Sequence, residues 1–203
     1  MPRLSLNKSA LHKAEHQLRI YQRFLPSLDL KRKHLIAERA RAQQALCETG
    51  DRLTELDNII TRELPMLADH EVGLEYLVTI AGSEVSEENI LGISLPVLKQ
   101  VHLNRRAYSF LIRPHWVDRV QDLMAEALTL RLRMRVQRER QQRLEKAVRK
   151  ITQRVNLFDK VLIPRTREHI RKIGIFLADS ERAAVVRAKI AKTRHSSRTN
   201  GSD

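Results

Sequence analysis

Apolar residues spaced seven apart run through the first third of the chain, and this repeat constrains the fold more than any other feature. One series recurs every seven residues from Leu4 to Leu67, with Arg32 and Arg39 as its only charged members. A second series, three residues later, comprises Ala14, Tyr21, Leu28, Leu35, Ala42 and Leu56. Alternating steps of three and four residues mark the a and d positions of a coiled coil. The pattern predicts a first coiled-coil arm over residues 1–67.

A second run with the same spacing occupies the later part of the chain. Its members are Val120, Leu123, Ala127, Leu130, Met134, Leu144, Val148, Ile151, Val155, Phe158 and Leu162. Beyond Pro164 the apolar positions move to Ile170, Ile173, Leu177 and Ala184. This run predicts a second coiled-coil arm over residues 115–192. We expect residues 193–203, which are basic and then polar, to be disordered.

The residues between the arms, 68–114, have a different composition. Between Leu74 and Pro96, apolar residues that include Tyr76 flank the polar stretch 83–89, which favours a short β-hairpin. Elsewhere the scarcity of glycine and proline, six of each in the chain, favours long helices. Two arms separated by a compact insert close most simply on each other. The predicted fold class is therefore all-α, a long antiparallel two-helix coiled coil with a short β-hairpin insert.

Two prolines deep within the arms suggest how the arms align. Pro26 and Pro164 each remove a backbone donor and are expected to bend their own helix. Facing residues of an antiparallel pair have residue numbers with a constant sum. A loop centred near residues 91–96 requires a sum of roughly 182 to 192, and the two prolines, with a sum of 190, lie within that range. The register hypothesis therefore places both prolines at one depth and Leu18 beside Ile173.

The charge of the chain leaves several kinds of partner open. Its 38 Lys and Arg against 24 Asp and Glu give a formal net charge of +14, which attracts nucleic acid, anionic lipid or an acidic protein surface alike. No stretch approaches the roughly 18 apolar residues of a membrane span, and the first residues lack the apolar core of a signal peptide. The single cysteine, Cys47, is interpreted as a structural thiol in a reducing, cytoplasmic setting.

Sequence motifs of enzyme chemistry are missing. The chain contains no Gly-x-x-x-x-Gly-Lys-Ser/Thr loop to bind nucleotide phosphates. His12 and His16 stand four residues apart but have no third ligand nearby, so they are interpreted as surface histidines rather than a metal site. We therefore expect no catalytic residue, no metal and no cofactor.

Three stretches resemble the D subunits of V-type ATP synthases and ATPases. The most specific, Arg154-Val-Asn-Leu-Phe-Asp-Lys-Val-Leu-Ile-Pro-Arg165, is similar to the family segment Arg-Val-Asn-x-Leu-x-x-Val-Leu-Ile-Pro-Arg. The matching residues are Arg154, Val155, Asn156, Val161, Leu162, Ile163, Pro164 and Arg165. Asn89, Gly92 and Pro96 resemble positions of the family's hairpin, and residues 7–11 and 30–35 resemble its opening helix. Pro26 and Phe158 depart from the family pattern.

The resemblance implies a central rotor shaft that couples ATP synthesis or hydrolysis to proton or sodium transport and has no catalytic site of its own. Implied partners are the catalytic and nucleotide-binding subunits of the head, the small F subunit of the stalk, and a subunit that docks the shaft onto the membrane rotor. The paired ends of the arms would enter the head, where Arg187, Lys189 and Lys192 are candidate apex contacts. The same cations equally fit a solvated helix end, where they complement the helix macrodipole. The implied location is the cytoplasmic face of the membrane, as a peripheral subunit. The hairpin is expected to modulate turnover or docking.

Two other classes of protein fit parts of the sequence. A basic coiled-coil protein associated with nucleic acid would use the positive charge for phosphate contacts, but the chain has few aromatic residues and no recognised reading motif. A homodimerising adaptor would use the heptads equally well. The hairpin insert disfavours it, because the insert interrupts a long dimer and closes an intramolecular pair.

Overall fold

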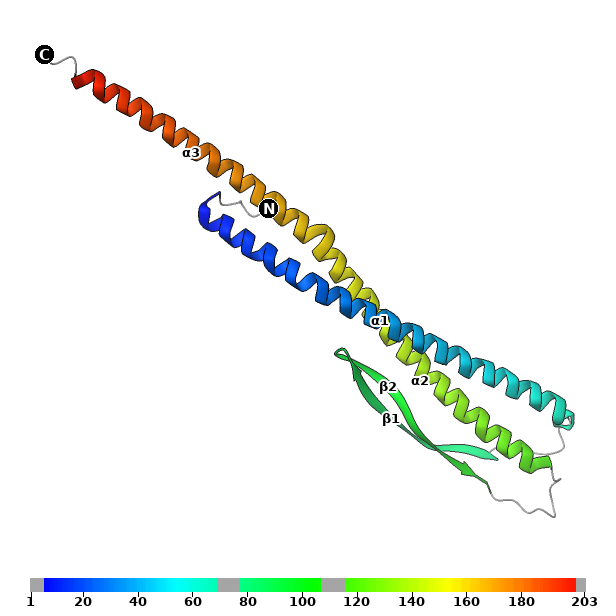
Figure 1. Cartoon of the computed structure of the whole chain (residues 1–203). Helices are drawn as coiled ribbons and strands as arrows, with labels where there is room; N and C mark the ends of the chain where they lie inside the picture. The colour runs from blue at the N-terminus through cyan, green and yellow to red at the C-terminus, as the bar shows by residue number, and fades with distance from the viewer. Residues whose placement is uncertain (1–5, 69–76, 107–115, 200–203) are drawn as a thin grey trace. The chain divides into compact units, whose positions relative to one another are not determined.

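The computed structural model describes residues 6–68, 77–106 and 116–199. In chain order they form α1 (Lys8–Glu63), a 3₁₀ turn (Pro65–Ala68), β1 (Val78–Ile90), β2 (Ile93–Arg105), α2 (Trp116–Asn156), a π-helical segment (Leu157–Leu162) and α3 (Ile163–Thr199) (Figure 1). The chain divides into two compact units. The terminal unit comprises Met1–Leu30 and Ile151–Asp203, and the central unit comprises Lys31–Lys150. The predicted class, helical with one β-hairpin, is confirmed.

Local chemistry explains where α1 begins and ends. The Asn7 side-chain oxygen accepts the N–H of Ala10 at 2.7 Å, which caps the first turn. At the other end, Pro65 has no N–H and disfavours a helical backbone at the residue before it, so the α-helix gives way to the 3₁₀ turn. Pro26 lies inside α1 without ending it, and the hydroxyl of Ser27 donates to the carbonyl of Phe24 at 2.8 Å beside it.

The buried line of α1 in the central unit follows the second heptad series. Its buried residues are Leu35, Ala42, Thr49 and Leu56, each seven after the last. Thr49 was absent from the predicted series because it is polar, but its hydroxyl donates to the Ala45 carbonyl at 2.9 Å and is therefore satisfied. Leu46, Leu53 and Ile60 of the first series are half-buried beside this line. The heptad pattern thus identified the packing face of the helix correctly.

The central unit has its main core where α1 ends and α2 begins, and we call this cluster the basal core. Its buried members are Leu56, Leu64, Leu77, Val78, Val117, Val120, Leu123, Ala125 and Leu130. Burying an aliphatic side chain of this size contributes about 1.5–3 kcal/mol. Gln121 of α2 connects this helix to both ends of the hairpin. Its side-chain amide donates to the carbonyls of Leu77 and Arg106 at 3.3 and 3.2 Å. The basal core therefore joins both helices to the start of the hairpin.

The hairpin is longer than predicted, and its turn lies elsewhere. β1 and β2 pair antiparallel, with Ile90 opposite Ile93 beside a two-residue turn of Leu91 and Gly92. Both turn residues have positive φ, 53° and 79°, as the favoured two-residue hairpin turns require. The Asn89 side chain accepts the N–H of Gly92 at 2.9 Å and stabilises this turn.

The polar stretch 83–89 was expected around the turn but lies within β1, which ends only at Ile90. It is compatible with a strand because β1 is exposed along most of its length. β2 continues past Pro96 to Arg105. Leu74 and Tyr76, which were assigned to the predicted hairpin, lie outside the described residues.

The register hypothesis based on the prolines is wrong. In the terminal unit the rings of Tyr21 and Phe158 meet edge to face, with 5.4 Å between centroids, whereas a sum of 190 would place Tyr21 opposite residue 169. In the central unit the side-chain amides of Gln43 and Gln141 form a hydrogen bond. Their residue numbers sum to 184, which lies within the expected range but differs from the 190 of the two prolines. The error came from taking the hairpin turn as the centre of the loop. The register follows instead from the residues at which α1 ends and α2 begins.

The proline of the second arm lies just after the π-helical segment. Pro164 has no N–H to donate, and its ring would clash with the carbonyl four residues earlier in a regular helix. The wider preceding turn accommodates this, and the N–H of Ile163 bonds to the carbonyl of Phe158, five residues back. α3 then continues to Thr199. The expected disorder of residues 193–203 stays a prediction. No glycine or proline interrupts the sequence between Pro164 and Thr199 apart from Gly174, so helix propensity is maintained there.

Candidate protein-docking site

Side chains that bind metals or act as nucleophiles are scattered among the described residues. No group of three or more His, Cys, Asp or Glu that could hold a metal ion occurs among them. His12 is exposed and lies 3.6 Å from the carboxylate of Glu15, and Cys47 is an exposed free thiol. Among the described helices there is also none that is long and apolar enough to cross a membrane. Exposed surfaces of the described residues can contact another macromolecule.

The segment 154–165, which resembles the family motif, divides into buried and exposed residues. Val155 and Ile163 are buried, and Leu162 is half-buried, so these side chains pack within the terminal unit. The other motif residues, Arg154, Asn156, Val161, Pro164 and Arg165, are exposed. Val161 and its neighbour Leu157 stand one helical turn apart with 47 % and 46 % of their surface exposed. The exposed part of the motif is thus available to a partner, while the buried part supports the fold.

The candidate apex residues lie on a fully exposed part of α3. From Asp179 to Lys192 every residue is exposed, including Arg187, Lys189 and Lys192. Figure 1 shows α3 continuing beyond the first turn of α1 in the terminal unit. Val185, Val186 and Ile190 are exposed on the same stretch, with up to 69 % of their surface accessible. A helix with both apolar and basic side chains exposed has the chemistry of a contact surface.

The three hairpin residues singled out from the sequence have structural roles. Asn89 and Gly92 form the turn, as described above. Pro96 lies in β2 opposite Glu87, where its missing N–H removes no hydrogen bond between the two strands. It therefore lies on the outer edge of β2, next to Ser94, whose outward carbonyl accepts a hydrogen bond from Arg143 of α2 at 3.1 Å. The outer edge of β2 consequently faces α2.

Charged side chains connect the distal half of the hairpin to α2. Arg140 pairs with Glu88 at 3.0 Å, and Arg143 pairs with Glu87 at 3.4 Å. The hydroxyl of Ser94 also donates to Glu87, at 2.5 Å. This hydroxyl, and then Arg143, lower the pKa of Glu87 below its ordinary value. These contacts are largely exposed, and exposed pairs each contribute only about 0–1 kcal/mol. Near its turn the hairpin is therefore held by these weak pairs together with the buried side chain of Leu95 in β2, which is 0 % exposed.

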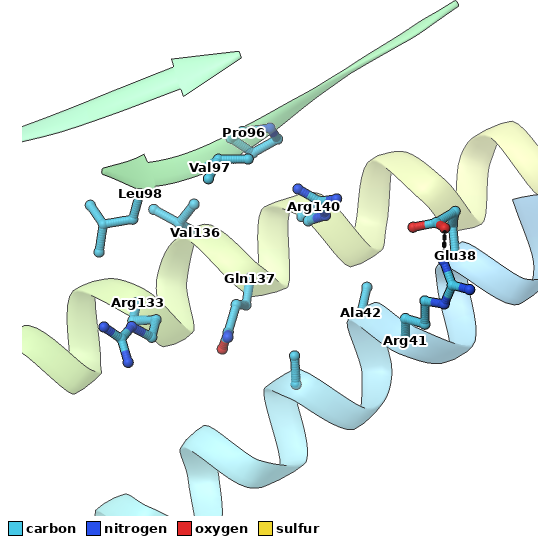
Figure 2. Close-up of a pocket in the computed structure, with 11 residues that line it drawn as sticks. Glu38, Arg41, Ala42, Pro96, Val97, Leu98, Arg133, Val136, Gln137 and Arg140 are labelled. Atoms are coloured by element: carbon cyan, nitrogen blue, oxygen red, sulfur yellow. Dashed lines mark hydrogen bonds and ion pairs between the residues drawn. The ribbon is translucent and has the colours of Figure 1, made fainter. Parts of the chain in front are cut away.

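A groove lies between β2, α2 and α1 in the central unit (Figure 2). Its cavity has a volume of about 420 Å³. The lining is contributed by Glu38, Arg41, Ala42 and Ala45 of α1, by Pro96, Val97 and Leu98 of β2, and by Arg133, Val136, Gln137 and Arg140 of α2. The space exists because α1 contributes alanines here, where the basal core has leucines.

Two polar groups of this groove have no partner among the residues that the structure describes. The side-chain oxygen of Gln137 is buried and accepts no hydrogen bond. Figure 2 shows this side chain pointing from α2 toward α1. Arg133, one turn earlier on α2, is exposed and has no hydrogen bond or ion pair within the described parts of the chain. The other charges of the lining are paired, since Arg41 contacts Glu38 at 2.5 Å and Arg140 contacts Glu88.

Sequence reasoning did not identify Arg133, Gln137 or the Arg143–Glu87 pair. One signal was present, because the predicted apolar series of the second arm has a gap between Met134 and Leu144. Gln137 and Gln141 occupy that gap. A polar residue on a coiled-coil packing face marks a position where packing is imperfect.

Comparison with known proteins identifies the family. The family of ATP synthase D subunits matches residues 10–193. The V-type ATP synthase D subunit of Chlamydia felis is 32% identical over 207 residues, which cover 98% of this chain and 97% of the relative. The corresponding protein of Borreliella burgdorferi is 28% identical over 193 residues, 95% of each chain. That of Chlamydia muridarum is 31% identical over 198 residues, 94% of this chain and 95% of the relative. The chain belongs to the family of ATP synthase D subunits.

Proposed function

We propose that this chain is a non-catalytic subunit of the central stalk of a V-type ATP synthase or ATPase, where it rotates and couples ATP synthesis or hydrolysis to proton or sodium transport. The observation that carries the proposal is the family match over residues 10–193, combined with a paired-helix fold that has a buried heptad face. The nucleic-acid alternative gains no support from the relatives, which are named as D subunits of V-type ATP synthases.

The fold supports a mechanical role. Two helices joined along an apolar face resist bending and twisting better than one helix does. The exposed surface is also uneven, with charged contacts and a hairpin on one part of α2 and exposed apolar residues on α3. As such a subunit turns, each surrounding subunit meets different side chains in succession. Differential contact energy shifts the conformational equilibrium of those subunits.

The partners follow from the same proposal. The catalytic and nucleotide-binding subunits of the head contact the exposed end of α3, which includes Arg187, Lys189 and Lys192. The small F subunit of the stalk binds the side of the helix pair, and a further subunit docks the stalk onto the membrane rotor. The chain itself is peripheral, on the cytoplasmic face of the membrane. Its apolar and basic exposed residues suit contacts with acidic protein surfaces.

The chain has no catalytic residues in this proposal, because its sequence lacks a phosphate-binding loop. The direct test is to assemble the complex in vesicles with and without this chain, and to measure ATP hydrolysis and ion transport together. We expect the isolated chain to show no hydrolysis, and vesicles without it to lose transport linked to hydrolysis. Full coupling in the absence of the chain would contradict the proposal.

A matched pair of variants makes the test sharper. Val185→Asp places a charge on the exposed apolar part of α3, while Ala188→Asp places the same charge on an exposed residue that is not apolar and bulky. If α3 contacts the head through its apolar side chains, the first variant should lower coupled transport more than the second. Equal effects would argue against that contact.

A further inference from the structure

The groove between β2, α2 and α1 differs from the rest of the central unit in its polar chemistry. A buried oxygen without a donor costs about 1–3 kcal/mol, and Gln137 has such an oxygen. The apolar side chains Val97, Leu98 and Val136 line the same space. Arg133 adds a positive charge at its edge that is unpaired within the described parts of the chain. An apolar cavity with a few convergent polar groups has the features of a binding site.

The groups of the groove that lack a partner indicate the chemistry of a ligand that would fit there. Gln137 needs a hydrogen-bond donor for its oxygen, and Arg133 needs an anion, ideally a carboxylate that it can bind through two N–H groups. The walls formed by Val97, Leu98 and Val136 need an apolar side chain. A peptide segment supplies all three at once, through its backbone or side-chain N–H, an Asp or Glu, and a neighbouring apolar residue.

We propose that this groove is a docking site for an acidic peptide segment of another subunit of the assembled complex. The proposal rests on the function proposed above, since it takes the occupant to be a subunit of that complex. Charge complementarity favours an acidic occupant, because the chain has a net charge of +14 and Arg133 has no partner among the described residues. The segment places its carboxylate on Arg133, its N–H on Gln137, and its apolar side chain against Val97 and Leu98.

The distal half of the hairpin forms one wall of the groove. The contacts of Glu87 and Glu88 with Arg143 and Arg140 hold that wall in place. The adjoining Leu95 of β2 is 0 % exposed, so buried apolar packing fixes the wall as well. The occupant is therefore a segment whose side chains fit the present cavity of about 420 Å³.

The test uses the full chain in the purified complex, with Cys47→Ser to remove the native thiol. Ala45→Cys places a thiol in the groove, and it is labelled with benzophenone maleimide as a photoreactive probe. Ala40→Cys, an exposed alanine of the same helix outside the groove, is the matched control. We expect the Ala45 probe to crosslink to a segment of another subunit that contains Asp or Glu beside an apolar residue, and the Ala40 probe to give at least about tenfold less of that product.

Two charge variants then test the chemistry. Arg133→Glu should reduce the crosslink about tenfold, while Arg135→Glu, an exposed arginine of α2 that does not line the groove, should leave it unchanged. Replacing the crosslinked acidic residue by Lys should restore the product in the Arg133→Glu background.

Several outcomes would overturn the docking proposal. They are a crosslink only to a second copy of this chain, no crosslink in an intact and active complex, or a crosslink equally sensitive to both arginine variants. Failure of the chain to co-purify with an ATPase at all would instead reject the proposed function, and the docking proposal with it. The two failures are therefore distinguishable.

Discussion

The basal core and the groove lie on the same two helices of the central unit, yet they pack very differently. Leu56 and Leu123 of the basal core are 2 % and 4 % exposed, and large aliphatic side chains fill the space between the helices. At the groove, α1 contributes Ala42 and Ala45 while α2 contributes Gln137. Heptad spacing is therefore enough to align two helices, but the size of the side chains decides whether the space between them is filled.

The difference assigns separate tasks to the two regions. The basal core buries nine hydrophobic side chains in one cluster and joins the hairpin to the helices. The groove leaves one polar atom unsatisfied, and such positions in native proteins call for an explanation. Binding of a partner segment is the explanation that we test above, and stability measurements can establish the contrast independently.

The largest expected effect is at the basal core. Leu56→Ala removes a buried side chain and should lower the free energy of unfolding by about 3 kcal/mol, because the surrounding residues cannot fill the cavity. Urea unfolding of the full chain, followed by far-ultraviolet circular dichroism, measures this loss. Leu30→Ala is the control, since Leu30 is 58 % exposed and should change stability by less than about 0.5 kcal/mol. If both variants lost the same free energy of unfolding, Leu56 would not be a core residue in the sense proposed.

A substitution in the groove is expected to raise the free energy of unfolding, by less than Leu56→Ala lowers it. Gln137→Leu removes the unsatisfied oxygen and adds apolar contact, so it should raise the free energy of unfolding by about 1 kcal/mol. Gln141→Leu, one turn later, should change it by less than about 0.5 kcal/mol, because the Gln43 oxygen that loses its donor is exposed and can bond to water instead. Destabilisation by Gln137→Leu would show that the groove is better packed than its geometry indicates.

A substitution in the hairpin turn should change stability less than the substitutions above. Leu91 has φ of 53°, a backbone conformation that Asn adopts more readily than Leu. Leu91→Asn should therefore raise the free energy of unfolding of the hairpin by about 0.5–1 kcal/mol, measured as slower amide hydrogen exchange in β1 and β2. Val85→Asn provides the contrast, because Asn is disfavoured within a strand. Faster exchange in Leu91→Asn would mean that the leucine side chain makes contacts that outweigh the strain.

The smallest effect concerns the contact between the distal hairpin and α2 at low pH. The hydroxyl of Ser94, and then Arg143, lower the pKa of Glu87 below 4.5 in the folded chain. Because the folded pKa is depressed, the contact is fully present above pH 4.5 and is lost as the pH falls through the lower folded value. A carbon-13 titration of the Glu87 carboxyl should have its midpoint below 4.5, and Ser94→Ala should move it upward more than Arg143→Gln does. A midpoint at 4.5 in the unmodified chain would show that the contact does not form.

The sequence predicted the helical parts of the fold well because their packing repeats. Leu35, Ala42 and Leu56 were placed on one face by spacing alone, and all three are buried. The hairpin turn was misplaced because a polar stretch was taken as a loop, although an exposed strand can be equally polar. The better signal was Asn89 with Gly92, since Gly adopts positive φ without strain.

The groove could not be predicted in the same way. It requires alanines of α1, an arginine and a glutamine of α2, and a proline-containing strand to meet in space. The register that joins them depends on where the helices end, and the sequence reasoning placed that register incorrectly. Only the gap in the apolar series at Gln137 indicated that this part of the helix pair is unusual.

The π-helical segment has a consequence for the helix that follows it. Ile151 and Val155 are buried, and regular steps from them would bury Leu162 and Arg165 next, but the buried residues are Ile163, Thr166 and Ile173. The wide turn thus takes up one extra residue. One residue corresponds to about 100° of rotation in an α-helix, so the buried positions after the turn lie one residue later in the sequence than a regular repeat would place them. Deleting one residue within 157–162 would convert this turn to a regular α-helix and leave the downstream buried face in place. Deletion of one residue near the start of α3 instead would turn that face toward solvent.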